Sequence, residues 1–295
     1  MTTLPPFELH AAHTVAEATE LLTELADDAV VYSGGTELLL LLKLGFAAYG
    51  HLVDVKPIAE LSGVSVQDAH LRIGGAVTHR AIERSPLVAA GWPALGAMEG
   101  KLANVRVRSV GTLGGNLAFA DPHSDPATWL LAADARLVLG LGEARRTLSV
   151  ADFVLGPYAT ALEPGELIVA IEVPALQAGG AISHTRFAFH ERPAATISCR
   201  VLVQDGRVAG ASIAVGSVGI VPVLVPDAGA QLIGQTADDL DAAVLDAVGR
   251  AAAQAADPVA DSNGSAEYKR DLVRVLVGRG VREATGTASR LATAA

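Results

Sequence analysis

Two glycine-containing segments of the chain carry the residue types that bind an anionic phosphate. They are Ser33-Gly34-Gly35-Thr36-Glu37 and Gly111-Thr112-Leu113-Gly114-Gly115-Asn116. Glycine allows positive φ and close approach of a ligand to the backbone, while Thr36, Thr112 and Asn116 offer side-chain hydrogen bonds to phosphate oxygens. Each segment follows an apolar or β-branched run, so we expect its N–H groups where a strand ends and a helix begins. Two such loops suit a pyrophosphate, although one Gly-Gly pair alone is more often only a turn.

A carboxylate follows the second glycine segment, in Asp121-Pro122-His123-Ser124-Asp125. Asp125 has the chemistry to accept hydrogen bonds from sugar-like hydroxyls, as a site for a polyol phosphate requires. A helix N-cap explains Asp125 equally well, because Pro126 suits the first helical position. None of the eight histidines occurs in HExxH or another metal-ligand spacing, and no serine occurs in a GxSxG motif. The sequence therefore indicates neither a metal site nor a catalytic residue.

The composition sets limits on the partners of the chain. Its 295 residues, 51% hydrophobic and 18% charged, are enough for two or three compact units. A net charge of −10 without a basic block argues against nucleic acid as a partner. The single cysteine, Cys199, excludes an internal disulfide framework, a cysteine-ligated iron–sulfur cluster and a cysteine zinc site. Any such centre would belong to another chain.

The sequence also predicts a cytoplasmic protein that does not span a membrane. The first eight residues hold no basic segment followed by an apolar run, as a signal peptide would. The most apolar run, 38–42, is bounded by Glu37 and Lys43. It is far shorter than the roughly 20 residues that a bilayer span needs, so we expect it to be a buried helix face.

The elements that must position the first glycine segment form a small α/β unit over residues 1–55. Thr14, with Glu17 three residues later, is a capping-box signature for a helix over 14–26. The further elements expected here are a strand over 29–32 that leads into the first glycine segment, a helix over 37–44 and a strand over 51–55.

A second α/β unit is expected over residues 56–176 and a third over 177–295. The second is predicted to contain short strands around 71–76, helices over 79–84, 94–103 and 127–133, and strands over 135–139 and 166–174. Gln177-Ala178-Gly179-Gly180 is the best linker candidate. The third unit is predicted to contain a β-hairpin of 197–204 and 207–215 around Asp205-Gly206, helices over 237–256 and 266–279, a polar loop over 257–265, and a frayed tail after Glu283.

Further segments accompany the two glycine loops in a specific order. They are Val107–Ala118, Ser124-Asp125-Pro126, Ser33–Leu39, Leu71–Thr78, Gly165–Ile168 and Ala214–Val218. Together they resemble the flavoprotein subunits of molybdenum hydroxylases, which include the medium subunits of aerobic carbon monoxide dehydrogenase and the flavin domain of xanthine dehydrogenase. The resemblance extends from about residue 7 to residue 280, and two loops with matching spacing and flanks make it specific.

The resemblance implies an α+β chain with noncovalently bound FAD. It implies a FAD-binding fold of the vanillyl-alcohol-oxidase (PCMH) type in two subdomains, 1–55 and 56–176, and a C-terminal α/β domain over 177–295 with an antiparallel sheet. The residues implied to bind FAD are Ser33, Gly34, Gly35, Thr36 and Glu37 around the pyrophosphate, with Gly111, Thr112, Gly115 and Asn116 on its other side. They also include Asp125 at the ribityl or ribose hydroxyls, Leu167 or Ile168 near the adenine, and Leu102 against the isoalloxazine edge.

The chain departs from the family pattern where its C-terminal domain begins. Family members usually have charged residues there, at two positions that are Ala188 and Ala195 in this chain, although the aromatic residues and Arg192 are kept. The charged group that would reach the flavin from this domain is therefore expected to be absent, or to be replaced by His190 or Glu191.

The resemblance implies an electron-transfer subunit and not the site of substrate hydroxylation. The implied partners are a large molybdopterin subunit and a small 2Fe-2S subunit, in a heterohexamer with two copies of each chain, and a quinone or NAD as electron acceptor. Two alternatives stay open. One is a self-sufficient FAD-dependent oxidoreductase of the same fold, for which the sequence offers no acid or base over the flavin. The other is a flavin-free assembly protein.

Overall fold

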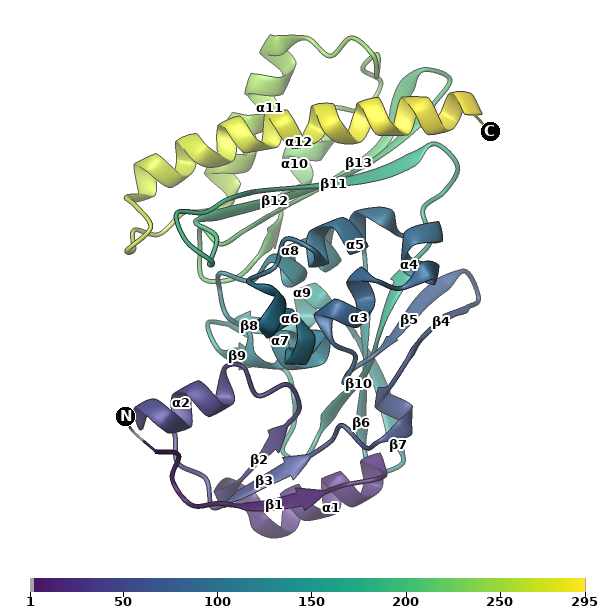
Figure 1. Ribbon diagram of the computed structural model, residues 1–295. Helices are drawn as coiled ribbons and strands as arrows, with labels where there is room; N and C mark the ends of the chain where they lie inside the picture. Colours follow the sequence, from purple (N-terminus) through teal and green to yellow (C-terminus); the bar gives the residue numbers. More distant parts are fainter. Residues whose placement is uncertain (1–2, 295) are drawn as a thin grey trace. The chain divides into compact units, whose positions relative to one another are not determined.

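The computed structural model describes residues 3–294, which form two compact units (Figure 1). The first unit runs to Ala120 and also includes 136–153 and 158–173. The second comprises 121–135, 154–157 and the chain from Pro174 onward. Each unit is therefore assembled from three separate stretches of the chain.

A parallel three-stranded sheet of order β1-β3-β2 forms the N-terminal part of the first unit. Its elements are β1 (Glu8–Ala11), α1 (Val15–Leu25), the 3₁₀ helix η1 (Ala26–Asp28), β2 (Ala29–Tyr32), α2 (Leu38–Leu44) and β3 (His51–Asp54). The predicted cap of α1 is confirmed, because the Thr14 hydroxyl accepts the Glu17 N–H at 3.0 Å and the Glu17 carboxylate accepts the His13 N–H at 2.7 Å. Helix α1 packs on the sheet over an apolar core that includes Val15 and Val53.

A five-stranded sheet of order β4-β5-β10-β6-β7 forms the rest of the first unit. Its strands are β4 (Val64–Gln67), β5 (His70–Gly74), β6 (Arg136–Leu141), β7 (Ala144–Ser149) and β10 (Leu167–Pro174). The connections hold η2 (Ala59–Leu61), α3 (His79–Glu83), α4 (Pro86–Gly91), α5 (Pro93–Glu99), α6 (Val105–Val110), α7 (Leu113–Phe119), α9 (Val150–Phe153) and β9 (Ala159–Thr160). The pairs β4–β5, β6–β10 and β6–β7 are antiparallel.

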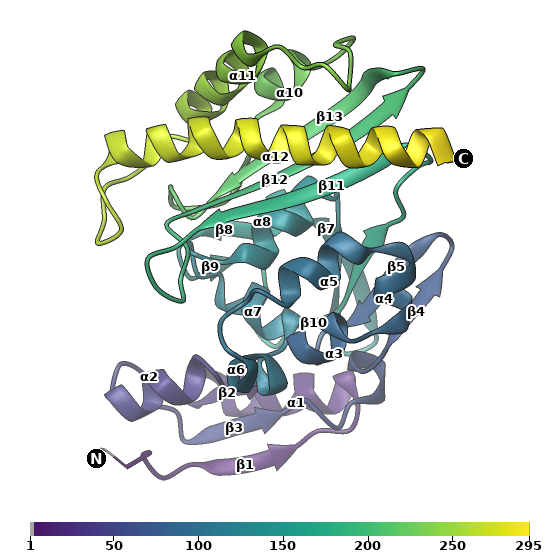
Figure 2. The same ribbon diagram turned by 45° about the horizontal axis from the view of Figure 1, so that its top comes forward.

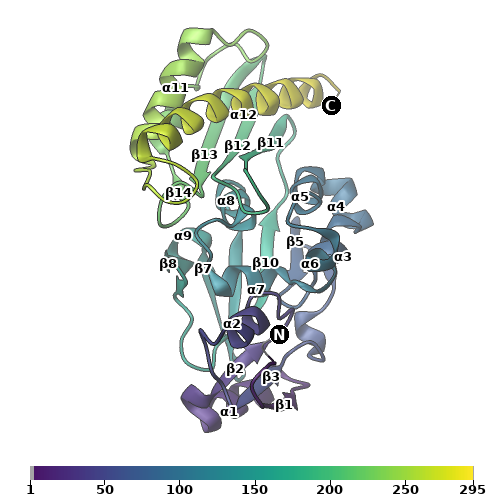
Figure 3. The same cartoon turned by 60° about the vertical axis from the view of Figure 1, so that its left-hand side comes forward.

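An antiparallel sheet of order β11-β12-β13-β14 forms the second unit. Its elements are α8 (Asp125–Ala132), β8 (Val154–Gly156), β11 (Gly180–Phe187), β12 (Ala195–Gln204), β13 (Arg207–Gly216), β14 (Val223–Leu224), α10 (Pro226–Ala230), α11 (Ala242–Ala255) and α12 (Ala266–Ala294). Helix α12 lies along the sheet (Figure 2), and α8 packs on the opposite face (Figure 3). The predicted hairpin around Asp205-Gly206 and the antiparallel sheet of the C-terminal domain are confirmed.

Three sequence predictions about elements are wrong. The run 38–42 is helical but is not a buried helix face, because only Leu42 is buried and Leu40 is 46% exposed. Helix α12 continues to Ala294, where a frayed tail was expected after Glu283. Ala284 and Ala288 are 1% and 0% exposed, so the helix continues because its small residues pack against the domain. The run before the second glycine loop is helix α6 and not a strand, because the Asn104 side chain caps it. Among residues 3–294, no helix has the length and apolar character needed to cross a membrane.

Candidate phosphate-binding site

The first glycine loop, residues 33–37, joins β2 to α2 as the sequence predicts. Gly35 has a φ of +70°, which L side chains rarely adopt, and its carbonyl accepts the Leu39 N–H at 3.0 Å. The N–H groups of Gly34, Gly35 and Thr36 donate none of the backbone hydrogen bonds that the described chain forms outside helices and strands. The loop therefore presents a run of backbone donors that suits an anionic oxygen.

The two glycine loops lie against each other. The hydroxyls of Ser33 and Thr112 are 3.1 Å apart. A Cβ atom on Gly34 would lie 2.4 Å from the carbonyl oxygen of Val110 and 2.7 Å from the Cα of Gly111, so only glycine fits at position 34. The structure thus brings together the two loops that the sequence placed at one site.

The second glycine loop contributes mainly a hydroxyl, which differs from the expectation that both loops supply backbone donors. The Thr112 side chain accepts the Gly115 N–H at 3.1 Å, and the Thr112 carbonyl accepts the Asn116 N–H at 2.9 Å. The N–H groups of Leu113 and Gly114 donate to other carbonyls of the first unit. Gly115 is exposed and Asn116 is half-buried at the start of α7.

Close backbone contacts fix the second loop on the five-stranded sheet. A Cβ atom on Gly114 would lie 2.4 Å from the carbonyl oxygen of Gly75, and a Cβ atom on Gly75 would lie 2.0 Å from that of Ile168. Leu167 and Ile168 are 3% and 6% exposed at the start of β10. Gly75 was not a predicted site residue, although its pairing with Gly74 in the sequence signals such a close approach.

Lys56, which belongs to no recognised sequence motif, lies beside the first loop. The Lys56 ammonium donates to the Ser33 carbonyl at 3.3 Å and lies 2.6 Å from the Asp54 carboxylate. It also sits 3.8 Å from the centroid of the Tyr32 ring. Its side chain remains 43% exposed, so its charge is partly balanced by Asp54 and still accessible to a ligand. The position of Lys56 just after a strand of the same sheet is the signal that could have found it.

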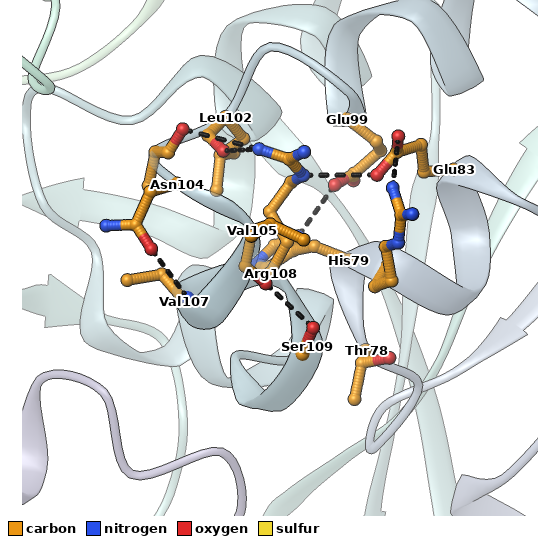
Figure 4. Close-up of polar contacts among 12 residues, drawn as sticks. Thr78, His79, Glu83, Glu99, Leu102, Asn104, Val105, Val107, Arg108 and Ser109 are labelled. Atoms are coloured by element: carbon orange, nitrogen blue, oxygen red, sulfur yellow. Dashed lines mark hydrogen bonds and ion pairs between the residues drawn. The ribbon is translucent and has the colours of Figure 1, made fainter.

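A buried pair of His79 and Glu99 (Figure 4) is linked to the second loop through the backbone of His79. The His79 ring nitrogen Nδ1 lies 2.7 Å from Glu99 Oε2, and the two residues are 2% and 0% exposed. The His79 backbone N–H donates to the carbonyl of Gly111 at 3.0 Å. Glu99 Oε1 finds no hydrogen-bond partner among the described residues. The sequence does not predict this pair, because His79 and Glu99 are twenty positions apart and belong to no recognised motif.

Leu102 is held by an arginine network next to this pair (Figure 4). Arg108 donates from Nη1 to the Leu102 carbonyl at 2.9 Å and from Nε to the Glu83 carboxylate at 3.1 Å. Hydrogen bonding from Arg80 and then from Arg108 lowers the pKa of Glu83, against the opposing effect of burial. The side chain of Leu102 is buried, and the hydrogen bond from Arg108 holds its backbone carbonyl.

Asp125 belongs to the second unit and is already engaged there. Its carboxylate lies 3.1 Å from His184 Nε2 and 3.4 Å from Arg186 Nε. The expected N-cap is displaced by one residue, because Ser124 is the N-cap residue of α8 and Asp125 is its first helical residue. His190 and Glu191, the expected replacements near Ala188, are exposed.

One cluster outside this site contains potential metal ligands, although its residues show no metal-ligand spacing along the sequence. Glu8, His10 and His51 place one ligand atom each within 4.8 Å of one another. They come from neighbouring strands, β1 and β3, which the sequence spacing does not reveal.

Family comparisons cover most of the chain in two parts. Residues 5–176 match the family described as the FAD binding domain in molybdopterin dehydrogenase. Residues 184–284 match the family described as the CO dehydrogenase flavoprotein C-terminal domain.

Known relatives match the chain over more than nine-tenths of its length. The carbon monoxide dehydrogenase medium chain of Afipia carboxidovorans is 31% identical over 96% of this chain and 98% of its own length. The xanthine dehydrogenase FAD-binding subunit of Escherichia coli O157:H7 is 29% identical over 95% of this chain and 96% of its own. A solved structure of carbon monoxide dehydrogenase from Hydrogenophaga pseudoflava matches with a TM-score of 0.92 and 32% identity, covering 97% of this chain and 99% of that chain.

Proposed function

The chain belongs to the family of FAD-binding medium subunits of molybdenum hydroxylases, and from this premise we propose that it passes electrons from iron–sulfur clusters of a partner chain through FAD to an external acceptor. The chain is thus the FAD subunit of a multi-subunit molybdenum-dependent oxidoreductase. When bound, FAD supplies one- and two-electron chemistry. The chain supplies the site that binds and orients it.

The observation that carries the proposal is the pairing of the two glycine loops. Gly34, Gly35 and Thr36 offer uncommitted N–H groups, and the Ser33 and Thr112 hydroxyls meet beside them. A pyrophosphate needs many donors and little steric bulk, which this donor set provides. Lys56 adds a positive charge at the edge of the first loop.

The remaining contacts are part of the same proposal. The other predicted ligands are Glu37, Gly111, Gly115 and Asn116 near the pyrophosphate, Asp125 at the sugar hydroxyls, Leu102 at the isoalloxazine edge and Leu167 or Ile168 at the adenine. Of these, Asp125 would exchange its contacts with His184 and Arg186 for hydroxyl groups of FAD. The carboxylate is suited to either set of donors.

Partner chains supply the metal centres in this proposal. Cys199 is 0% exposed, and burial raises the pKa of its thiol to about 12, so it is not a cluster ligand. Partner subunits in this family carry molybdopterin and iron–sulfur clusters. We assign this chain to a cytoplasmic complex with a large and a small subunit, in two copies of each chain, and a quinone or NAD as acceptor.

Expression of the chain alone and with its two partners tests the proposal. The chain is expected to show flavin absorbance in the visible range and to release all of its flavin on acid precipitation. It should become active toward an electron acceptor only in the complex. A yellow acid precipitate would show covalent flavin. Turnover of an organic substrate by the chain alone would identify a self-sufficient oxidoreductase instead, and a colourless chain that takes up no added FAD would identify a flavin-free protein.

A further inference from the structure

Two imidazoles and a carboxylate converge at one end of the parallel sheet. His10 Nε2 lies 2.9 Å from His51 Nδ1, and a Glu8 carboxylate oxygen lies 3.8 Å from the same nitrogen. Glu8 pairs with His51 across β1 and β3, and His10 is two residues further along β1, so the three side chains leave the same face of the sheet. The Glu8 side chain is 68% exposed and that of His51 25%, so solvent ions reach the cluster.

These separations approximate the coordination sphere of zinc. Zinc–nitrogen and zinc–oxygen bonds of about 2.0–2.2 Å at a tetrahedral angle hold neighbouring ligand atoms about 3.3 Å apart. The two measured separations, 2.9 and 3.8 Å, lie on either side of that value. All three ligand atoms lie within 4.8 Å of one another, so rotation of the side chains can bring them to this spacing. Three protein ligands leave one tetrahedral position for water.

A second carboxylate supports one of the imidazoles. Asp28 Oδ2 lies 4.0 Å from His51 Nε2, the ring nitrogen opposite the one that faces His10. The Gly50 N–H donates to Asp28 Oδ1 at 2.7 Å and holds the carboxylate in place. At 4.0 Å Asp28 is beyond hydrogen-bond distance of the ring, so it acts on the imidazole through its charge. Glu8 and Asp28 also give the surroundings of the cluster a negative charge, which favours a cation.

We propose that Glu8, His10 and His51 form a binding site for a divalent transition-metal ion, with zinc as the natural occupant. Two imidazoles and a carboxylate suit zinc, copper and nickel and disfavour calcium and magnesium. The metal replaces the hydrogen bond between the two rings and ties β1 to β3. Because β2 pairs with β3 and leads into the first glycine loop, the ion stabilises the sheet that carries the loop.

Calorimetric titration of the full chain, without an affinity tag, tests the site with Zn²⁺ as the probe. We expect one equivalent to bind, and His10→Asn and His51→Asn to lower its affinity by at least about tenfold. His70→Asn serves as the control, because His70 is exposed and outside the cluster. Asp28→Asn removes a nearby negative charge and should weaken binding by less than either histidine variant, without removing the site. Circular dichroism of each variant checks that it is folded.

A spectroscopic measurement identifies the ligands directly, whatever the effect of each substitution on the stability of the fold. Cu²⁺ bound to the unaltered chain should give an electron paramagnetic resonance spectrum with coupling to two imidazole nitrogens, and to one in either histidine variant. The proposal is overturned if no equivalent of Zn²⁺ binds, or if His10→Asn and His51→Asn bind as the unaltered chain does. None of these readouts depends on FAD, so failure here leaves the proposed function untouched.

Discussion

The Ser33 and Thr112 hydroxyls lie 3.1 Å apart, although 79 positions separate these residues in the chain. Ser33 comes from a loop that follows a parallel strand, and Thr112 from a turn between two short helices. Their contact is the point at which the two halves of the proposed pyrophosphate site meet. A change at either hydroxyl should therefore affect a ligand that both loops share.

Thr112→Val should weaken FAD binding more than it weakens the fold. Loss of the cap on Gly115 should cost about 1 kcal/mol of the free energy of unfolding. Loss of a hydroxyl from the proposed pyrophosphate site should lower FAD affinity by about tenfold to a hundredfold. Thr14→Val is the matched control, because Thr14 caps α1 in the same way and contacts neither loop. Equal FAD affinities in the two variants, measured by fluorescence titration, would remove Thr112 from the site.

Gly35→Val should abolish flavin retention and leave the fold largely intact. Gly35 has positive φ, and a Cβ atom there would lie 2.5 Å from the Tyr32 ring, so the loop must change shape. Gly45→Val provides the control, because Gly45 has a φ of +74° with no atom within 4 Å of an added Cβ. Both variants should lose about 1–2 kcal/mol to backbone strain. Only the first should lose flavin absorbance after gel filtration.

Gly115→Val extends the test to the second loop. A Cβ atom at Gly115 would lie 2.8 Å from the Thr112 hydroxyl, so the variant should displace that hydroxyl and reduce flavin occupancy. If Gly35→Val and Gly115→Val both keep the occupancy of the unaltered chain, then the two loops are not the binding site.

The pair of Arg146 and Glu166 should make stability depend on pH in the acidic range. Burial opposes the charged form of Glu166, but two hydrogen bonds of 2.7 Å from Arg146 and one from the Glu163 N–H lower its pKa on balance. Because the folded-state pKa is depressed, this stabilisation is present above the ordinary value of 4.5 and is lost as the pH falls through the folded-state value.

Glu166→Gln should therefore be less stable than the unaltered chain at neutral pH, and the difference should shrink below pH 4.5. Urea unfolding over a pH series measures it. Glu163→Gln is the comparison, since its side chain is 61% exposed and 3.7 Å from Arg146. A difference that stays constant with pH would show that the charge of Glu166 is not responsible.

His79→Leu should be strongly destabilising because it leaves the Glu99 carboxylate buried without its partner. Leaving a buried polar group without its hydrogen-bond partner typically costs about 1–3 kcal/mol or more. The double variant His79→Leu/Glu99→Leu should recover most of that loss, because it leaves neither polar group of the pair without its partner. Additive losses in the double variant would mean that the two side chains do not interact in the folded protein.

Local sequence signals were sufficient for the first glycine loop and for the hairpin of the second unit. An apolar run, two glycines and a helix former lie together around Gly35, and strand alternation surrounds Asp205-Gly206. The second loop could not be predicted in the same detail. The Gly114 N–H is taken by the carbonyl of Gly75, which is distant in sequence, so only the folded chain shows which donors remain.

The end of α12 and the proposed metal site of Glu8, His10 and His51 could not be predicted from the sequence, for two further reasons. Alanine side chains are small, so Ala284 and Ala288 give only a weak apolar pattern, and the sequence around them is typical of a frayed tail. In the folded chain both residues are buried. His10 and His51 become neighbours only through the pairing of β1 with β3, which no spacing along the chain encodes.

The position of helix α8 in the chain has a consequence during synthesis of the protein. The helix is synthesised before most of the second unit, yet it packs on β12 and β13, where the Thr128 hydroxyl lies 2.9 Å from that of Thr196. Thr196 leaves the ribosome 68 residues after Thr128. During that interval the buried face of α8 lacks its cover, so the nascent chain carries an aggregation-prone surface. A chain that stops near residue 176 would keep that exposure permanently.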